Sequence, residues 1–301
     1  MKESILVTGA SSVIGQSLLP RLFAQDLSVH VISRRPELAK NDSIANCYLC
    51  DLNADTLPEV FFKKIEAAKI QTLVHCAPIW LLPQHITALA ELGVQRVIAF
   101  SSTSIEGKSS SENTHEQRIV QLLSESEQQL SSTAKLLNVD LTIFRPTMIY
   151  GHGKGMNLAF IARFIQKIGF FPVVTKAAGL RRPVHADDLA QAVEFALSEA
   201  VTFGKTYALS GSQVMTYQEM VERVFQSLDK PKRILPVPLP IYKLAISVVA
   251  KFSNLSMTPS MAERMRDDLN FSSEQAMQDF GYAPGSFLPN GIADILPTLH
   301  R

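Results

Sequence analysis

A glycine-rich segment close to the amino terminus has the residue types and spacing of a phosphate-binding turn. It reads Ile5-Leu-Val-Thr-Gly-Ala-Ser-Ser-Val-Ile-Gly15, a β-branched run that leads through two glycines into an apolar segment. Gly9 permits a tight turn, and Gly15 lets a following helix pack close to the strand. The free amides of the first helical turn would then face a pyrophosphate. We therefore predict a dinucleotide site, with a turn that binds nothing as the alternative. The predicted phosphate-binding residues are Thr8, Gly9, Ser11, Ser12, Val13, Ile14 and Gly15.

The end of the second predicted strand carries two positive charges, Arg34 and Arg35. Sites for NAD commonly place an acidic residue here to bind the ribose hydroxyls, whereas arginine suits the additional 2′-phosphate of NADP. The sequence therefore predicts NADP in preference to NAD. A solvated basic loop is the alternative interpretation.

Alternating strands and helices must position these residues. Such alternation predicts βαβ crossovers, a parallel sheet and helices on both of its faces, with ligands at the carboxyl ends of the strands. The predicted strands are Ile5–Val7, Val29–Ile32, Thr72–His75, Arg96–Phe100 and Leu141–Phe144, and the predicted helices between them are Gly15–Gln25, Glu59–Ala68, Gln84–Leu92 and Thr114–Leu137.

The pattern becomes more fragmented after Gly151. Here we predict a strand at Lys205–Leu209 and helices at Asn157–Ile168, Asp187–Ser198, Tyr217–Ser227, Pro240–Ser253, Pro259–Leu269 and Ser273–Phe280. The predicted fold is α/β, a Rossmann-type doubly wound parallel sheet with a smaller, mostly helical carboxyl-terminal cap. We expect residues 1–152 to form the dinucleotide-binding domain, to which 176–200 return, and 153–175 and 201–301 to form the substrate domain.

Composition argues against several classes of protein. With 29 basic and 28 acidic residues the net charge is +1, and no aromatic-plus-basic motif occurs, so nucleic-acid binding is disfavoured. Neither the three cysteines nor His152, His185 and Asp187 have the spacing of metal ligands, so no metal site is predicted. A spanning helix needs roughly 18–20 uninterrupted apolar residues, and the sequence has no such run. We expect a cytoplasmic protein without a transmembrane segment.

Two longer motifs strengthen the dinucleotide interpretation. They are Ile143-Phe-Arg-Pro-Thr-Met-Ile-Tyr-Gly-His-Gly153 and Arg182-Pro-Val-His-Ala-Asp-Asp-Leu-Ala190. They resemble the Arg-Pro-x-x-x-Tyr-Gly-x-Gly and Val-His-Val-Asp-Asp-Val-Ala motifs of the extended short-chain dehydrogenase/reductases, the NAD-dependent epimerase/dehydratase family. The glycine turn resembles that family's Thr-Gly-x-x-Gly-x-x-Gly, except that Ser12 replaces the middle glycine. The resemblance implies further cofactor contacts from Asp51, Leu52, Cys76, Ala77, Pro78, Ser101 and Ser102.

The family's catalytic pattern is incomplete in this chain. Active members use a serine or threonine together with Tyr-x-x-x-Lys on one helical face, where the ammonium lowers the pKa of the phenol. Thr103 aligns with the hydroxyl residue, but the helix that should carry the pair has no tyrosine, and Ile119 and Leu123 align with its positions. Tyr150 and Lys154 have the literal spacing, but two glycines between them argue against a shared helical face.

The candidate catalytic residues are therefore Thr103, Tyr150 and His185. His75 and His152 are further candidates because a neutral histidine can relay a proton near physiological pH, although a given histidine is more often structural. The resemblance implies a small-molecule substrate such as a nucleotide sugar, whose diphosphate would suit Arg145 and Arg182. A salt bridge between the domains is the alternative role of these arginines.

Three functions remain open at this point. We favour an atypical oxidoreductase of the epimerase/dehydratase type over a non-catalytic NADP(H)-binding sensor, scaffold or assembly factor. A structural remnant without a cofactor ranks last. A homodimer is compatible with this class of sheet, although the segment Gln117–Gln129 is rather polar for an interface.

Overall fold

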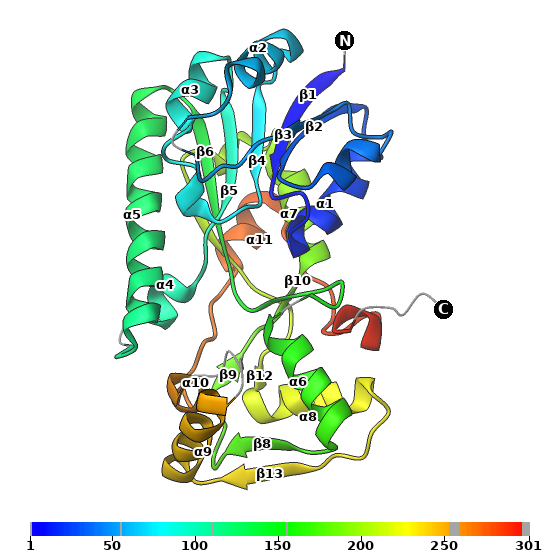
Figure 1. The fold of residues 1–301 in the computed structure, drawn as a ribbon, viewed down its shortest axis with the longest axis vertical. Helices are drawn as coiled ribbons and strands as arrows, with labels where there is room; N and C mark the ends of the chain where they lie inside the picture. Colours follow the sequence, from blue (N-terminus) through cyan, green and yellow to red (C-terminus); the bar gives the residue numbers. More distant parts are fainter. Residues whose placement is uncertain (1, 55, 110, 155, 253–258, 297–301) are drawn as a thin grey trace.

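The computed structural model of the chain describes residues 2–54, 56–109, 111–154, 156–252 and 259–296. Its centre is a sheet of seven parallel strands in the order β11-β6-β5-β4-β1-β2-β3 (Figure 1). The chain passes from β3 to β4 on the other side of β1, which is the arrangement of a Rossmann-type sheet. The predicted fold class is confirmed. The strands are β1 (Glu3–Thr8), β2 (Leu27–Ser33), β3 (Asn46–Leu49), β4 (Thr72–His75), β5 (Arg96–Phe100), β6 (Asp140–Pro146) and β11 (Thr206–Leu209).

Alternate residues of the central strands face opposite layers of helices. In β1, Ile5 and Val7 belong to one apolar core and Leu6 belongs to the other, as the period of two along a strand requires. Since both faces are covered, successive residues in the middle of these strands are apolar, as Ile5, Leu6 and Val7 are in β1. The first core lies against α1 (Val13–Phe23), α7 (Ala186–Ser198) and α11 (Glu274–Phe280), and the second against α2 (Glu59–Ala68), α3 (Ile86–Glu91) and α5 (Thr114–Leu136).

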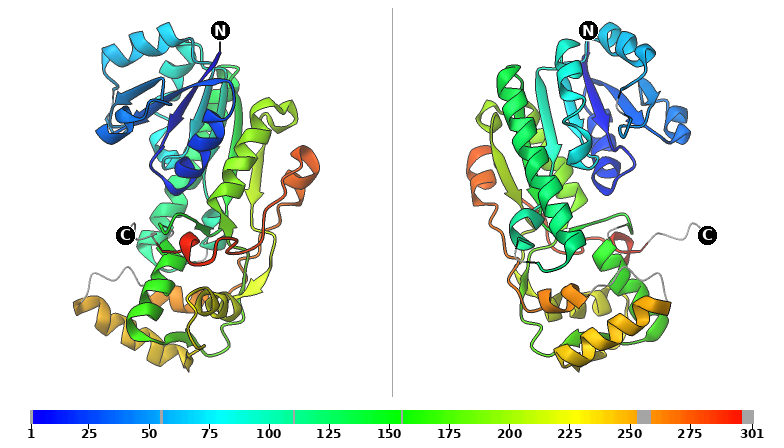
Figure 2. Two further views of the ribbon diagram at one scale, coloured as in Figure 1. Left: turned by 90° about the vertical axis from the view of Figure 1, so that its right-hand side faces the viewer. Right: turned by 60° about the vertical axis from the view of Figure 1, so that its left-hand side comes forward.

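The cap lies beyond the carboxyl ends of the strands and has an apolar core of its own (Figures 1 and 2). A parallel pair of strands, β8 (Phe171–Val174) and β13 (Ile234–Val237), packs with the helices of the cap. The helices are α6 (Met156–Ile168), α8 (Tyr217–Ser227), α9 (Leu239–Phe252) and α10 (Pro259–Arg264). The antiparallel pair is β9 (Leu180–Arg181) with β12 (Met215–Thr216), and β7 (Ile149–Tyr150) pairs with β10 (Val184–His185) where the chain passes between sheet and cap.

Short elements complete the connections. They are the 3₁₀ turns η1 (Pro36–Lys40), η2 (Ile79–Leu81), η3 (Ala200–Thr202) and η4 (Gly291–Asp294), and the single helical turn α4 (Ser104–Gly107). Among the described residues, no helix is both long enough and apolar enough to cross a membrane.

Two predicted elements differ from the structure, and the end of a third cannot be compared. The strand predicted at Lys205–Leu209 pairs with β6 in the main sheet, although the predicted division places it in the cap. The helix predicted over Pro259–Leu269 ends at Arg264, because the backbone of Leu269 donates to the carbonyl of Leu180 beside β9. The predicted end of α9 at Ser253 lies outside the described residues.

Candidate functional site

The glycine turn packs against its neighbours without room for side chains. Gly9 has a φ of +67°, and a Cβ on it would lie 2.4 Å from the backbone nitrogen of Ala77. A Cβ on Gly15 would lie 2.4 Å from the carbonyl oxygen of Gly9. The turn therefore needs both glycines, one for its left-handed backbone and one for the close contact of α1 with the turn. Thr8 ends β1 and Ser11 lies inside the turn.

Ser12 explains how the turn forms without its middle glycine. Its φ of −67° suits any residue, and its hydroxyl oxygen accepts a hydrogen bond from the amide of Gly15 at 3.0 Å. Ser12 is thus the N-cap of α1. The amides of Val13 and Ile14 belong to the first turn and have no acceptor within the helix itself.

The two arginines after β2 have different surroundings. The guanidinium of Arg34 lies 4.0 Å from the carboxylate of Asp51. That carboxylate also accepts hydrogen bonds from Asn53, and these bonds are the main cause of its lowered pKa. Arg35 instead lines a cleft of about 420 Å³ between α1 and η1. The carbonyl of Leu52 accepts a hydrogen bond from Gln84.

His75 at the end of β4 is a structural residue that ties two loops together. Its Nε2 lies 3.0 Å from the carbonyl of Pro78, which can only accept, so Nε2 carries the hydrogen. Its Nδ1 then accepts the hydroxyl hydrogen of Thr8 at 2.7 Å. Burial lowers its pKa to about 4. Both ring nitrogens of this neutral imidazole are hydrogen-bonded within the chain, so His75 holds the residues beside the turn in place and has no nitrogen free to bind a substrate proton. The amide of Cys76 donates to the carbonyl of Thr8, and Ala77 follows within contact of Gly9.

The loop after β5 brings three hydroxyl groups to the same edge. The Oγ of Ser101 is buried without a hydrogen-bond partner among the described residues. Ser102 donates to the hydroxyl of Ser104 at 3.0 Å. The hydroxyl of Thr103 donates to the carbonyl of Pro146 at 3.2 Å, and the residue is 5% exposed.

The face of α5 toward the sheet is apolar at the aligned positions of the catalytic pair. Leu123 is buried in the second core, and Ile119 and Trp80 pack against this core. Lys135 lies in the last turn of the helix, about three turns after Leu123. No phenol or ammonium therefore projects from the middle of α5.

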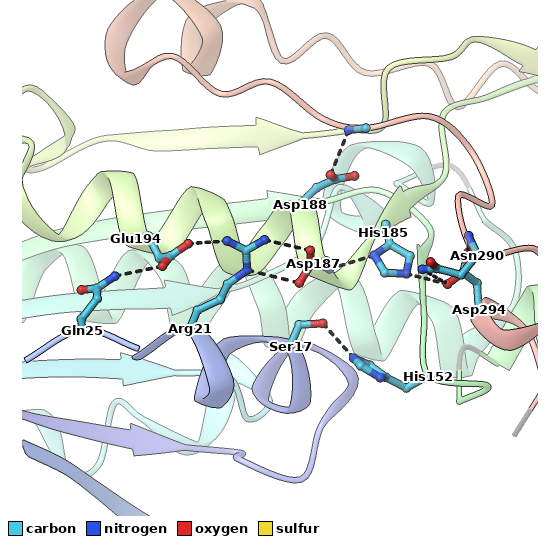
Figure 3. Close-up of polar contacts among 11 residues, drawn as sticks. Ser17, Arg21, Gln25, His152, His185, Asp187, Asp188, Glu194, Asn290 and Asp294 are labelled. Carbon is cyan, nitrogen blue, oxygen red and sulfur yellow. Dashed lines mark hydrogen bonds and ion pairs between the residues drawn. The ribbon is translucent and has the colours of Figure 1, made fainter. Parts of the chain in front are cut away.

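Tyr150 and His185 are engaged in the packing of the cap. Tyr150 is 1% exposed, its hydroxyl oxygen accepts from the amide of Leu288 at 3.0 Å, and burial raises the pKa of its phenol. The Nδ1 of His185 accepts from the amide of Asp187 as the N-cap of α7, and its Nε2 lies 3.1 Å from the carboxylate of Asp294 (Figure 3). Lys154 is exposed on a loop, so Tyr150 and Lys154 share no helical face.

The two predicted substrate arginines bind groups of the chain itself. Arg145 forms a bidentate contact with Glu127 and an ion pair with Glu106 at 2.5 Å, which raise its pKa. Arg182 donates to the carbonyls of Gly211 and Phe271. Arg145 thus links β6 to α4 and α5 within the sheet domain, and Arg182 links the segment before β10 to the segments around Gly211 and Phe271.

Sequence reasoning missed part of the cleft beside the turn. Its lining residues are Ala10, Ser11, Gln16, Leu19, Pro20, Phe23, Arg35, Glu37, Leu38, Asn41 and Lys154. Lys154 is separated by more than one hundred residues from the rest, so only the folded chain reveals this proximity. Within the described residues, no group of three or more histidine, cysteine, aspartate or glutamate side chains could hold a metal ion.

Comparison with known proteins identifies relatives along the whole chain. Over 97% of its length it is 25% identical to UDP-glucose 4-epimerase of Vibrio cholerae, 94% of which is matched. A segment covering 35% of the chain is 33% identical to NADH dehydrogenase (ubiquinone) 1 alpha subcomplex subunit 9 of Arabidopsis thaliana, a mitochondrial protein of which 26% is matched.

The fold is similar to a solved epimerase. UDP-glucuronic acid 4-epimerase from Bacillus cereus, in complex with UDP-glucuronic acid and NAD, aligns with a TM-score of 0.72 at 15% identity over 97% of this chain and 98% of that one. The model of the NAD dependent epimerase/dehydratase family matches residues 5–80 and 80–209. The chain belongs to the NAD dependent epimerase/dehydratase family.

Proposed function

We propose that this chain binds a nicotinamide adenine dinucleotide at the carboxyl edge of its seven-stranded sheet. The observation that carries the proposal is the cradle formed by Gly9 and Gly15, where added Cβ atoms would meet backbone at 2.4 Å. A turn without side chains lets a pyrophosphate approach the amides at the start of α1, where the helix dipole favours negative charge. The amides of Val13 and Ile14 are the donors that we assign to it.

The loop after β5 supports the same site. A buried hydroxyl without a partner costs roughly 1–3 kcal/mol, and the Oγ of Ser101 is such a group. A polar group of a bound cofactor would offset that cost. We assign Ser101 and Ser102 to the cofactor, together with Asp51 and Leu52 and with Cys76, Ala77 and Pro78.

We further propose that NADP is preferred over NAD. Arg35 lines the cleft beside Ser11, where its guanidinium suits a phosphate dianion. Arg34 lies 4.0 Å from the carboxylate of Asp51 and is not among the residues that line the cleft. The proposed dinucleotide domain comprises residues 1–152 and 176–200 with β11 and α11, and the remaining residues form the substrate domain.

The proposed reaction is a dinucleotide-dependent oxidation or reduction of a small molecule of the nucleotide-sugar class. The family and the UDP-sugar epimerases among the relatives support this class. The bound nicotinamide would supply the hydride acceptor or donor. In this chain Thr103 donates its hydrogen to Pro146, so its hydroxyl oxygen can accept a hydrogen bond from a substrate hydroxyl and orient it.

The apolar residues Ile119 and Leu123, at the positions aligned with the catalytic pair, lead us to expect slow turnover. A positioned general acid or base contributes typically about 10²–10⁴-fold to a rate, and neither residue can transfer a proton. We therefore expect turnover slower by about this factor than in a relative with the tyrosine and lysine.

The first experiment measures dinucleotide binding directly. Trp80, the chain's single tryptophan, lies in η2 just after β4, so its fluorescence should change on titration with NADPH or NADH. We expect saturable binding of both, tighter for NADPH. Gly9→Ala should abolish binding, whereas Gly204→Ala should not, because Gly204 has a similar φ of +69° but open space around it. Failure of the natural chain to bind either dinucleotide would contradict the proposal.

A second candidate function is dinucleotide binding without turnover, as a sensor, scaffold or assembly factor. The observation that favours it is that Thr103, Tyr150 and His185 are each hydrogen-bonded within the chain. The partial match to a protein named as a subunit of NADH dehydrogenase is compatible with such a role. Incubation with NADP⁺ and a panel of UDP-sugars distinguishes the two functions. A new product or reduced dinucleotide supports the oxidoreductase, whereas the absence of both supports binding without turnover.

A further inference from the structure

We propose that Lys154, on the loop that leads from the sheet into the cap, is a second cation for the dinucleotide's 2′-phosphate, in addition to Arg35. This inference rests on the proposed dinucleotide site. It adds a ligand from outside the β1–α1–β2 unit, so that one phosphate would bridge two distant segments of the chain. Lys154 and Arg35 line the same cleft of about 420 Å³, together with Ser11.

The backbone of the loop Gly151–Lys154 has an unusual conformation. Gly151, His152 and Gly153 have φ values of +137°, +53° and +65°, three successive residues in a region that non-glycine residues rarely adopt. The amide of Lys154 closes the turn on the carbonyl of Gly151 at 3.1 Å. Such a conformation persists only when surrounding contacts hold it.

Those contacts join the loop to α1 and to the carboxyl-terminal segment. The Nε2 of His152 lies 2.8 Å from the hydroxyl of Ser17, about one turn from the start of α1 (Figure 3). The amide of Gly153 donates to the carbonyl of Asp294 at 3.2 Å. Burial is the main cause of the lowered pKa of His152, so this link involves a neutral imidazole. The loop therefore holds the backbone of Lys154 over the start of α1.

The charges of the cleft favour a phosphate. Arg35 and Lys154 form no ion pair with any carboxylate that the structure describes, in contrast to Arg34. Among the residues that line the cleft, Glu37 alone is acidic. Two cations against one carboxylate leave a net positive cleft, which a phosphate dianion would neutralise more fully than a neutral ribose hydroxyl would.

The position of the cleft identifies which phosphate it would take. Ala10 and Ser11 belong to the glycine turn, and Arg35 is the second residue after β2. The residues after the second strand of a Rossmann sheet lie beside the adenosine ribose, at its 2′ position. The geometry thus separates the 2′-phosphate from the pyrophosphate, which we assign to the amides of Val13 and Ile14.

The test compares ligands that differ only in the 2′-phosphate. Titration calorimetry with 2′,5′-ADP and 5′-ADP is performed on the natural chain and on Lys154→Gln at about 0.15 M salt. A charge-assisted hydrogen bond that is partly exposed should be worth roughly a tenfold change in affinity. We expect Lys154→Gln to weaken 2′,5′-ADP about tenfold and 5′-ADP less than twofold. Glu37→Gln should act in the opposite direction and tighten 2′,5′-ADP alone.

Lys40→Gln is the matched control, because Lys40 lies on η1 but does not line the cleft. It should leave the ratio of the two affinities unchanged. An equal loss of both ligands in Lys154→Gln, or no loss of either, would overturn the role of Lys154 while leaving the dinucleotide site intact. If the natural chain binds neither these ligands nor NADPH nor NADH, the proposed function and this inference both fail.

Discussion

At the residue scale, the histidine at the end of β4 is kept neutral by the fold. His75 has a pKa of about 4 against an ordinary 6.5, chiefly because of burial and further because of the neighbouring His85. As the pH falls through 6.5, the unfolded chain binds a proton at this position while the folded chain does not. Acid therefore destabilises the fold progressively between pH 6.5 and pH 4 through this one group.

We predict that His75 accounts for a fall of about 3 kcal/mol in the free energy of unfolding between pH 7 and pH 4. Urea unfolding at a series of pH values measures it. His75→Gln should remove this part of the slope even if it lowers stability at pH 7. His115→Gln, at an exposed position, should keep the slope of the natural chain. Equal slopes in His75→Gln and the natural chain would refute the assignment.

Some roles of the site residues could be predicted from the sequence, and others could not. The roles of Gly9 and Gly15 follow from local spacing, because a turn between a strand and a helix requires them. The bonds of His75 and Tyr150 could not be predicted, since their partners lie far away along the chain, as with Thr8 for His75. The sequence therefore identifies which residues can titrate, whereas their role depends on burial and hydrogen-bond partners that only the folded structure shows.

At the scale of elements, α1 is joined to α7 by an ion-pair cluster rather than by apolar contacts alone. Arg21 binds Asp187 at 2.8 Å and Glu194 at 2.5 Å, and Gln25 donates to the second carboxylate (Figure 3). Asp187 lies in the first turn of α7, where its charge also favours the helix dipole. The cluster therefore fixes the helix that begins at the glycine turn.

We predict that Arg21→Met lowers the free energy of unfolding by about 1–2 kcal/mol, because two charge-assisted contacts are lost while the apolar stem is kept. Lys2→Met is the matched control. Its pair with Asp26 has side chains 61% and 83% exposed, and such pairs contribute about 0–1 kcal/mol. Denaturant unfolding measures both changes. A loss in Arg21→Met no larger than that in Lys2→Met would contradict the role of the cluster.

Strands and helices were predictable to different extents. The central strands follow from continuous apolar runs, which only a sheet covered on both faces explains. In contrast, β3 was not predicted, because it has four residues at the sheet's edge and begins with a polar asparagine. The carboxyl end of α10 depends on contacts with β9, which no local pattern reveals.

At the scale of the whole molecule, the cap is attached to the sheet domain through buried charges. Glu116 in the first turn of α5 is 6% exposed and forms ion pairs with Arg264 of α10 and with Lys108. Its hydrogen bond to Ser111 and these two cations outweigh burial and lower its pKa. Since α10 belongs to the cap, this carboxylate joins the two parts of the molecule on the side opposite the Gly151–Lys154 loop (Figure 1).

We predict that Arg264→Met loosens the cap without unfolding the sheet domain, because Glu116 keeps its contacts with Lys108 and Ser111. Hydrogen exchange should become faster in α10 and in the first turn of α5, by roughly tenfold for a loss of about 1.4 kcal/mol in local stability. Arg266→Met is the control, since among the described residues the guanidinium of Arg266 hydrogen-bonds to the carbonyl of Thr175 alone, within the cap. This variant should affect the cap and leave α5 unchanged. If both variants leave exchange in α5 as it is in the natural chain, the ion pair does not couple cap and sheet. If exchange also rises in the central strands, Arg264 stabilises the whole fold rather than the attachment of the cap.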